Sequence, residues 1–151
     1  MGKKARTAIM SFDLINEIIT MIAAALSVAA IQKISAELPM VYGIRAGISV
    51  ITGALGLFFA VMGLRCVIKD EKNTLLFAAL WFSLVVNTVR TIMFGFNIVI
   101  LFRTFHISGA NLLTTGSVSS ALLLTSGRGA LCFLTAAFMA VMLFELSGKE
   151  D

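Results

Sequence analysis

The sequence predicts an all-α integral membrane protein, a transmembrane bundle of four helices that forms a single domain over residues 1–151. Of these residues 59% are hydrophobic and 13% are charged, and the mean hydropathy is +0.99. An ordinary soluble domain carries roughly 25% charged residues, so a soluble fold of this size could not hide so much apolar surface. The charges also lie at the ends of apolar runs, which is how a membrane protein distributes them.

The first two segments each approach the ~20 residues needed to cross ~30 Å of hydrocarbon. The first runs from about residue 8 to 34, and the chain turns at residues 37–39. Polar residues interrupt its apolar stretch, so we interpret it as a span and not as a cleaved signal peptide. The second runs from about residue 43 to 68 and ends at the charged turn Lys69–Asn73, the sharpest boundary in the sequence.

The third segment runs from about residue 74 to 102 and ends near Arg103. The fourth begins somewhere near residue 120 and ends at residue 146. The approach to the fourth segment, residues 111–120, is rich in Gly, Ser and Thr. It is compatible with a loop, a re-entrant segment or an extra turn of a tilted helix.

Six small residues of the second segment are spaced three and four apart, which places them on one helical face. This small-residue ladder consists of Ala46, Ser49, Gly53, Gly56, Ala60 and Gly63. Small residues let helix backbones approach closely in a membrane. We therefore expect the ladder to pack against a neighbouring helix, either from this chain or from a partner subunit.

The other three segments carry stripes of polar or small residues at helical spacing. In the first segment the stripe is Asp13, Asn16, Glu17, Thr20, Ala24 and Ser27. In the third it is Ser83, Asn87, Arg90 and Thr91, and in the fourth it is Ser117, Ala121, Arg128, Cys132 and Thr135. Because polar groups are expensive in hydrocarbon, we expect these stripes to face the centre of the bundle.

The distribution of lysine and arginine predicts the orientation of the chain, because cytoplasmic connections retain positive charge. One side of the membrane holds seven such residues, namely Lys3, Lys4, Arg6, Arg65, Lys69, Lys72 and Lys149. The other side holds Lys33, Arg45 and Arg103. Both termini are therefore predicted to be cytoplasmic, and the net charge of +4 is attributed to topology and contact with lipid headgroups, not to nucleic-acid binding.

Three arginines, Arg45, Arg90 and Arg128, are predicted to gather toward the outer end of the bundle. Counted at 1.5 Å per residue from the cytoplasmic side, Glu17 lies roughly 10 to 15 Å deep and Arg90 roughly 24 Å deep, so a direct pair between them is not expected. The arginines could form an anion or lipid-binding site, since guanidinium groups grip phosphate or carboxylate with two hydrogen bonds. Alternatively, Arg45 and Arg128 reach to headgroups while Arg90 bonds neighbouring carbonyls and Asn87.

Asp13 and Glu17 allow two interpretations. Acidic groups favour the positive end of the helix dipole, so both could mark an interfacial helix start. A carboxylate within a span is also a candidate carrier of a proton or a cation.

No metal site or cofactor is predicted. The two cysteines, Cys66 and Cys132, are expected at different depths, so no disulfide between them is expected and both are interpreted as packing thiols. The single histidine, His106, has no obvious partner for metal binding or for activating a nucleophile.

A family resemblance rests on the stretch YGIRAGISVITGALGLFFAVMG, residues 42–63. Its pattern resembles the second span of the DoxX-like superfamily of small four-helix membrane proteins, and the matching positions are Arg45, Gly47, Gly53 and Gly56. Arg90 and Glu145 are similar to one uncharacterised branch of that group. The resemblance implies a left-handed four-helix bundle, often an accessory subunit beside a quinone-linked oxidoreductase or a membrane assembly. The redox cysteine pair of some relatives is absent here.

The function expected from the sequence is that of an accessory or interaction subunit of a membrane complex, whose partners are lipids and a membrane protein or further copies of the chain. The alternative is a small transporter or carrier of an ion or anionic solute, in which Glu17 and the outer arginines bind the cargo. An enzyme ranks last, because the sequence has no recognisable nucleophile, base or metal constellation.

Overall fold

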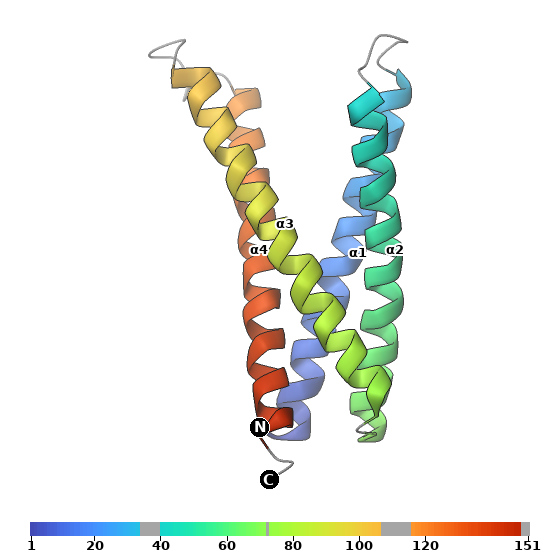
Figure 1. The fold of residues 1–151 in the computed structure, drawn as a ribbon. Helices are drawn as coiled ribbons and strands as arrows, with labels where there is room; N and C mark the ends of the chain where they lie inside the picture. The colour runs from blue at the N-terminus through green and yellow to red at the C-terminus, as the bar shows by residue number, and fades with distance from the viewer. Residues whose placement is uncertain (34–39, 72, 107–115, 149–151) are drawn as a thin grey trace.

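The computed structural model describes residues 1–33, 40–71, 73–106 and 116–148, which form four α-helices (Figure 1). They are α1 (Lys3–Lys33), α2 (Met40–Lys69), α3 (Thr74–His106) and α4 (Gly116–Ser147). Each contains a stretch long and apolar enough to cross a membrane, and the described residues contain no strand. The chain is thus an all-α four-helix bundle with the composition of a multi-pass membrane protein.

The helix boundaries agree with the predicted spans at the α2–α3 turn and differ at other ends. α1 begins at Lys3, five residues before the predicted start, because the basic N-terminal residues continue the helix. α4 begins at Gly116, so residues 116–120 form an additional helical turn of the kind left open by the sequence. Residues 111–115 lie outside the described part of the chain.

Backbone capping ends α2 and starts α3. Asp70 has a positive φ of 58°, and the amides of Asp70 and Glu71 donate to the carbonyls of Val67 and Cys66 at 3.2 and 2.9 Å. This arrangement is a Schellman motif. The side chain of Asn73 then accepts a hydrogen bond from the amide of Leu76 at 3.0 Å, as an N-cap does. The charged turn is therefore a specific chain reversal, and it brings α2 and α3 into an antiparallel pair.

The bundle consists of two hairpins. α1 packs mainly against α2, and α3 packs mainly against α4. Both chain termini and the α2–α3 turn lie at one end, here called the terminal end, whereas α1 ends and α4 begins at the opposite end, here called the far end. The two hairpins are close together at the terminal end and diverge toward the far end (Figure 1).

Among the described residues, the main apolar cluster lies in the half of the bundle near the terminal end. Its buried residues are Met10, Cys66, Val67, Leu76, Leu80, Met139, Met142, Leu143 and Leu146. Among the side chains that the structure describes, none is buried in α3 beyond Asn87 or in α4 before Cys132. Large apolar side chains nearer the far end are exposed, including Leu26, Phe96 and Leu123.

The small-residue ladder lies between α2 and α1. A Cβ atom added to Gly53 would lie 2.7 Å from Sδ of Met21, and one added to Gly56 would collide with the carboxylate of Glu17. A Cβ on Gly63 would likewise collide with Met10. The glycines of the ladder thus pack a helix of the same chain. The side chain of Ala46 lies outside the described residues.

Replacing Gly53 and Gly56 together with leucine is expected to destabilise the bundle, because overpacking costs typically about 1–3 kcal/mol at each site. The readouts are thermal stability and oligomer size in detergent. The matched control is the double variant Gly47→Leu, Gly95→Leu, since an added Cβ meets nothing within 4 Å at either position. If the ladder variant kept the stability and oligomer size of the wild type, the packing role of these glycines would be wrong.

Candidate functional site

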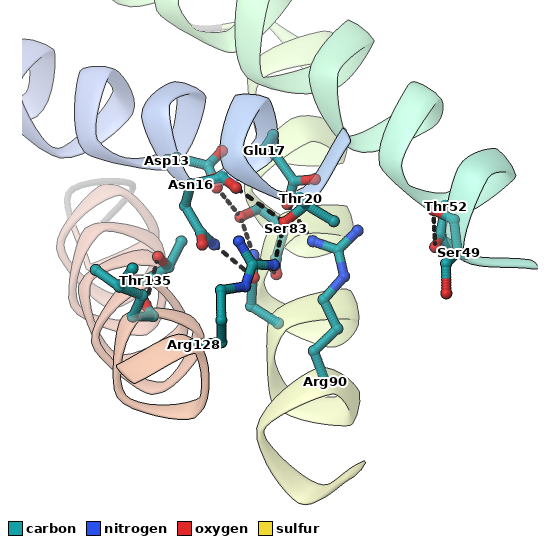
Figure 2. Close-up of polar contacts among 12 residues, drawn as sticks. Asp13, Asn16, Glu17, Thr20, Ser49, Thr52, Ser83, Arg90, Arg128 and Thr135 are labelled. Atoms are coloured by element: carbon teal, nitrogen blue, oxygen red, sulfur yellow. Dashed lines mark hydrogen bonds and ion pairs between the residues drawn. The ribbon is translucent and has the colours of Figure 1, made fainter. Parts of the chain in front are cut away.

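Polar side chains from three helices meet in the middle of the bundle (Figure 2). We call this set the central cluster; its members are Asp13, Asn16, Glu17, Thr20, Ser83, Asn87, Arg90 and Arg128. All eight belong to the polar stripes that the sequence predicted, and those of α1 are 1–7% exposed. These members of the stripes therefore face inward, and within each helix they share one face, as residues three and four apart do. The side chains of Ser27, Ser117 and Ala121 lie outside the described residues.

A chain of hydrogen bonds links α1 to α3. The hydroxyl of Ser83 donates to Oδ1 of Asp13 at 2.7 Å, and Nδ2 of Asn16 donates to Oδ1 of Asn87 at 2.9 Å. Nδ2 of Asn87 in turn donates to the Ser83 carbonyl and hydroxyl oxygens at 3.0 and 3.2 Å. These contacts hold the two hairpins in one register, because each residue has its partner at a matching turn of the other helix.

An ion pair lies next to this chain of hydrogen bonds. Nη1 of Arg90 donates to Oε1 of Glu17 at 2.5 Å, and the two side chains are 11% and 2% exposed. The expectation that these residues do not pair is wrong. α1 begins at Lys3, so Glu17 lies about 21 Å along α1 and Arg90 about 24 Å along α3, at matching depths.

Glycine makes room for the carboxylate of Glu17. A Cβ on Gly56 would lie 2.6 Å from Cδ of Glu17, so no larger residue fits there without movement. α2 thus contributes space to the central cluster, whereas its hydroxyl residues Ser49 and Thr52 lie apart from it (Figure 2). The sequence assigned Gly56 to helix packing alone.

Arg128 approaches the central cluster from α4. Its Nη2 donates to the hydroxyl of Thr20 at 2.8 Å, and its guanidinium carbon lies 5.8 Å from the ring centroid of Phe94. The interpretation in which Arg128 extends to lipid headgroups is therefore wrong, as is the one in which Arg90 bonds carbonyls and Asn87. The side chain of Arg45 lies outside the described residues.

The interpretation of Asp13 and Glu17 as an interfacial helix start is also wrong. Both are 1% exposed and lie several turns inside α1. The structure instead brings them together with Arg90 and Arg128. The sequence placed these further cluster members on inward stripes but did not assign them to a site: Asn16, Thr20, Ser83 and Asn87. The signal that could have identified the site is that the stripes lie at the same depth in the bundle.

Several atoms of the central cluster have no partner among the described residues. The buried side-chain atoms Oε2 of Glu17, Nη2 of Arg90 and Nη1 of Arg128 make no hydrogen bond there. Buried donors and acceptors without partners are costly. The cluster therefore has unused capacity for both accepting and donating hydrogen bonds.

The part of the chain that the structure describes contains neither a pair of bonded cysteines nor a group of metal ligands. Cys66 and Cys132 are both buried free thiols, the first in the apolar core and the second beside the central cluster. No group of three or more His, Cys, Asp or Glu residues among the described residues could hold a metal ion.

Comparison with protein-family models, with curated proteins and with solved structures found no match for this chain. The resemblance to the DoxX-like superfamily stays a prediction.

A double-mutant cycle on Glu17 and Arg90 is expected to show coupling. Glu17→Gln and Arg90→Gln should each lower the free energy of unfolding, and the double variant should recover part of the loss, with a coupling energy of about 0.5–3 kcal/mol for residues in contact. The measurement is reversible unfolding in mixed micelles. The matched control is the exposed pair Lys69 and Glu71, 3.9 Å apart and 50% exposed on both sides, for which about 0–1 kcal/mol is expected. Purely additive effects at Glu17 and Arg90 would contradict the pairing.

Proposed function

We propose that this protein is a small carrier that binds a charged solute at the central cluster and moves it across the membrane. The observation that carries the proposal is the ion pair of the buried Glu17 and the partly buried Arg90 in the middle of two apolar helices. Ionisable residues within a span are expensive, and in membrane proteins they mark ion and substrate pathways and proton relays.

The unused hydrogen-bonding atoms support this proposal over a purely structural role. A network that served only to hold helices together would be favoured when every member is satisfied. Here the carboxylate of Glu17 and the guanidinium groups of Arg90 and Arg128 each keep a buried atom that no described residue bonds. A solute that formed hydrogen bonds with these atoms would compensate for the interactions with water that they lost on burial.

The distribution of burial supports access to the central cluster from one end. Toward the terminal end, Met10, Leu80, Met139 and Met142 are fully buried and close the path. Toward the far end, the hairpins diverge, and no described side chain is buried in α3 beyond Asn87 or in α4 before Cys132. Arg90 and Arg128 are themselves only partly buried. This arrangement corresponds to one access state of a carrier, and movement of one hairpin against the other would supply the second state.

The orientation of this access state follows from the count of positive charges. With both termini in the cytoplasm, as the lysine and arginine distribution predicts, the far end faces the outside. The solute would then enter the central cluster from outside in the conformation described here.

Replacing Glu17 with glutamine is expected to abolish flux without loss of the fold, because glutamine keeps a side-chain oxygen for Arg90 but cannot carry the charge. Purified protein in vesicles is assayed with protons, potassium, chloride, acetate and inorganic phosphate as separate probes. Circular dichroism and elution volume check the fold. The control is Glu71→Gln, an exposed carboxylate outside the central cluster. Wild-type protein that moves none of these probes, or Glu17→Gln protein that moves them equally well, would rule out the carrier.

The role as an accessory or interaction subunit is our second proposal. It is supported by the exposed apolar side chains of the diverging half, such as Leu26, Phe96, Leu123 and Leu124, which are 65–74% exposed. A partner helix could cover these residues in place of lipid.

Purification from the native membrane is expected to recover an accessory subunit together with its complex at a fixed stoichiometry. Mass spectrometry identifies the co-purified chains, and an unrelated multi-pass protein of the same membrane serves as the control. Recovery of this chain alone, with a uniform particle size, would contradict the second proposal.

A further inference from the structure

Arg128 is a cation inside the bundle, and no ion pair joins it to the residues that the structure describes. Among the described residues, no carboxylate oxygen lies within 4.0 Å of its guanidinium group, which donates through Nη2 to the neutral hydroxyl of Thr20. Its Nη1 is buried and has no hydrogen-bond partner in the same part of the chain. An arginine at this depth is stabilised when an anion compensates its charge.

Arg90 presents a second unused donor near the same place. Its Nη1 is held by Glu17, but its buried Nη2 has no partner among the described residues. The acceptors of the two arginines, Glu17 and Thr20, are three residues apart on α1, and such neighbours have Cβ atoms about 5–6 Å apart. Figure 2 shows both guanidinium groups reaching toward this part of α1, one from α3 and the other from α4.

We propose that Arg128 and Arg90 form a binding site for an oxyanion, a carboxylate or phosphate group, which accepts hydrogen bonds from Nη1 of Arg128 and Nη2 of Arg90. This proposal rests on the carrier function and specifies the class of its solute. The bound oxyanion supplies the negative charge that Arg128 lacks, while Glu17 continues to compensate Arg90.

The donor chemistry selects an oxyanion over other ions. Guanidinium groups present planar, forked donors that match the oxygens of carboxylate and phosphate, and charge-assisted hydrogen bonds of this kind are the strong ones. A cation would be repelled by two guanidinium groups. A halide offers no pair of oxygens for the two donors to share.

The site can hold its geometry without the anion. Thr20 fixes one nitrogen of Arg128, and the ring of Phe94 lies under its guanidinium group. Thr20 is itself oriented, since its hydroxyl donates to the carbonyl of Asn16 at 2.8 Å. The donors are therefore already positioned for binding, which lowers the ordering cost of taking up a ligand.

Two sources can supply the same oxyanion chemistry at this position. A soluble anion could enter from water at the far end, and the phosphate of an anionic lipid could enter from the bilayer where the hairpins diverge. The two sources differ in whether a membrane of neutral lipids leaves the site available to inorganic phosphate.

The test is a titration of the full chain in nanodiscs of phosphatidylcholine with inorganic phosphate, followed by thermal unfolding and calorimetry, with chloride at equal ionic strength as the reference. We expect saturable stabilisation by phosphate, and a rise of ten-fold or more in the half-saturating concentration for Arg128→Gln. The matched control is Arg103→Gln, which removes an exposed arginine of α3 and should leave binding unchanged. If Arg128→Gln is not recovered folded, Arg128→Lys is measured in its place. Lysine keeps the positive charge but lacks the two planar donor nitrogens of arginine, so the affinity for phosphate is expected to fall several-fold.

A second set of nanodiscs that contain phosphatidic acid distinguishes the sources. If the lipid phosphate is the ligand, these nanodiscs stabilise the wild type over Arg128→Gln and inorganic phosphate adds nothing further. If a soluble anion is the ligand, phosphate binds equally in both membranes. Either result supports the oxyanion site.

The oxyanion site is overturned if neither phosphate source stabilises the wild type, or if Arg128→Gln responds as the wild type does. Flux measured on the same preparations separates this outcome from failure of the carrier. Glu17-dependent flux of protons or potassium without oxyanion binding would leave the carrier and remove the oxyanion site. Arg128-dependent phosphate binding without flux of any probe would leave the site and remove the carrier.

Discussion

The buried polar contacts between α1 and the α3–α4 hairpin are the constraint on which the rest of this structure depends. Apolar side chains supply packing within each hairpin and, through the core of the terminal half, between the hairpins, and the small-residue ladder packs α2 on α1. Between the hairpins, partners at matching depths join α1 to α3 and α4: Ser83 with Asp13, Asn87 with Asn16, Arg90 with Glu17, and Arg128 with Thr20. Apolar contacts tolerate a shift of one helix along another. Directional hydrogen bonds do not, so this network sets the register of the bundle.

The same network divides the bundle into two halves with different properties. On the terminal side the core is apolar and closed, and the α2–α3 turn is fixed by capping at Asp70 and Asn73. On the far side the hairpins diverge. The charges therefore lie where the two hairpins separate, although the helices within each hairpin remain packed there. In the proposed carrier, a solute would reach the charges at this position. Unused donors on Arg90 and Arg128 lie on this boundary, so the proposed site and the proposed access path coincide.

Much of the fold could be predicted, because hydrocarbon requires every backbone group to be satisfied within its own segment. Long apolar runs then become helices, and the turn Lys69–Asn73 was visible from its charges. The candidate site was predicted only in part. The inward stripes followed from the helical period. The Glu17–Arg90 pair was missed because the depth of Glu17 depends on where α1 begins. Apolarity alone does not define that start, since the basic first turn of α1 is helical although it is not apolar.

The sequence by itself determined the solvent of this protein, its helical class and which face of each helix turns away from lipid, since these follow from the free energy of transferring side chains into hydrocarbon. Tertiary structure alone decided which polar groups of the central cluster bond one another and which have no partner among the described residues. The position of Gly56 beside the Glu17 carboxylate depends on the relative height and rotation of separate helices. The same is true of Arg128, which bonds Thr20 and contacts no carboxylate of the described residues. The height and rotation of each helix are set by contacts among residues far apart in the chain, and no local sequence pattern predicts those contacts.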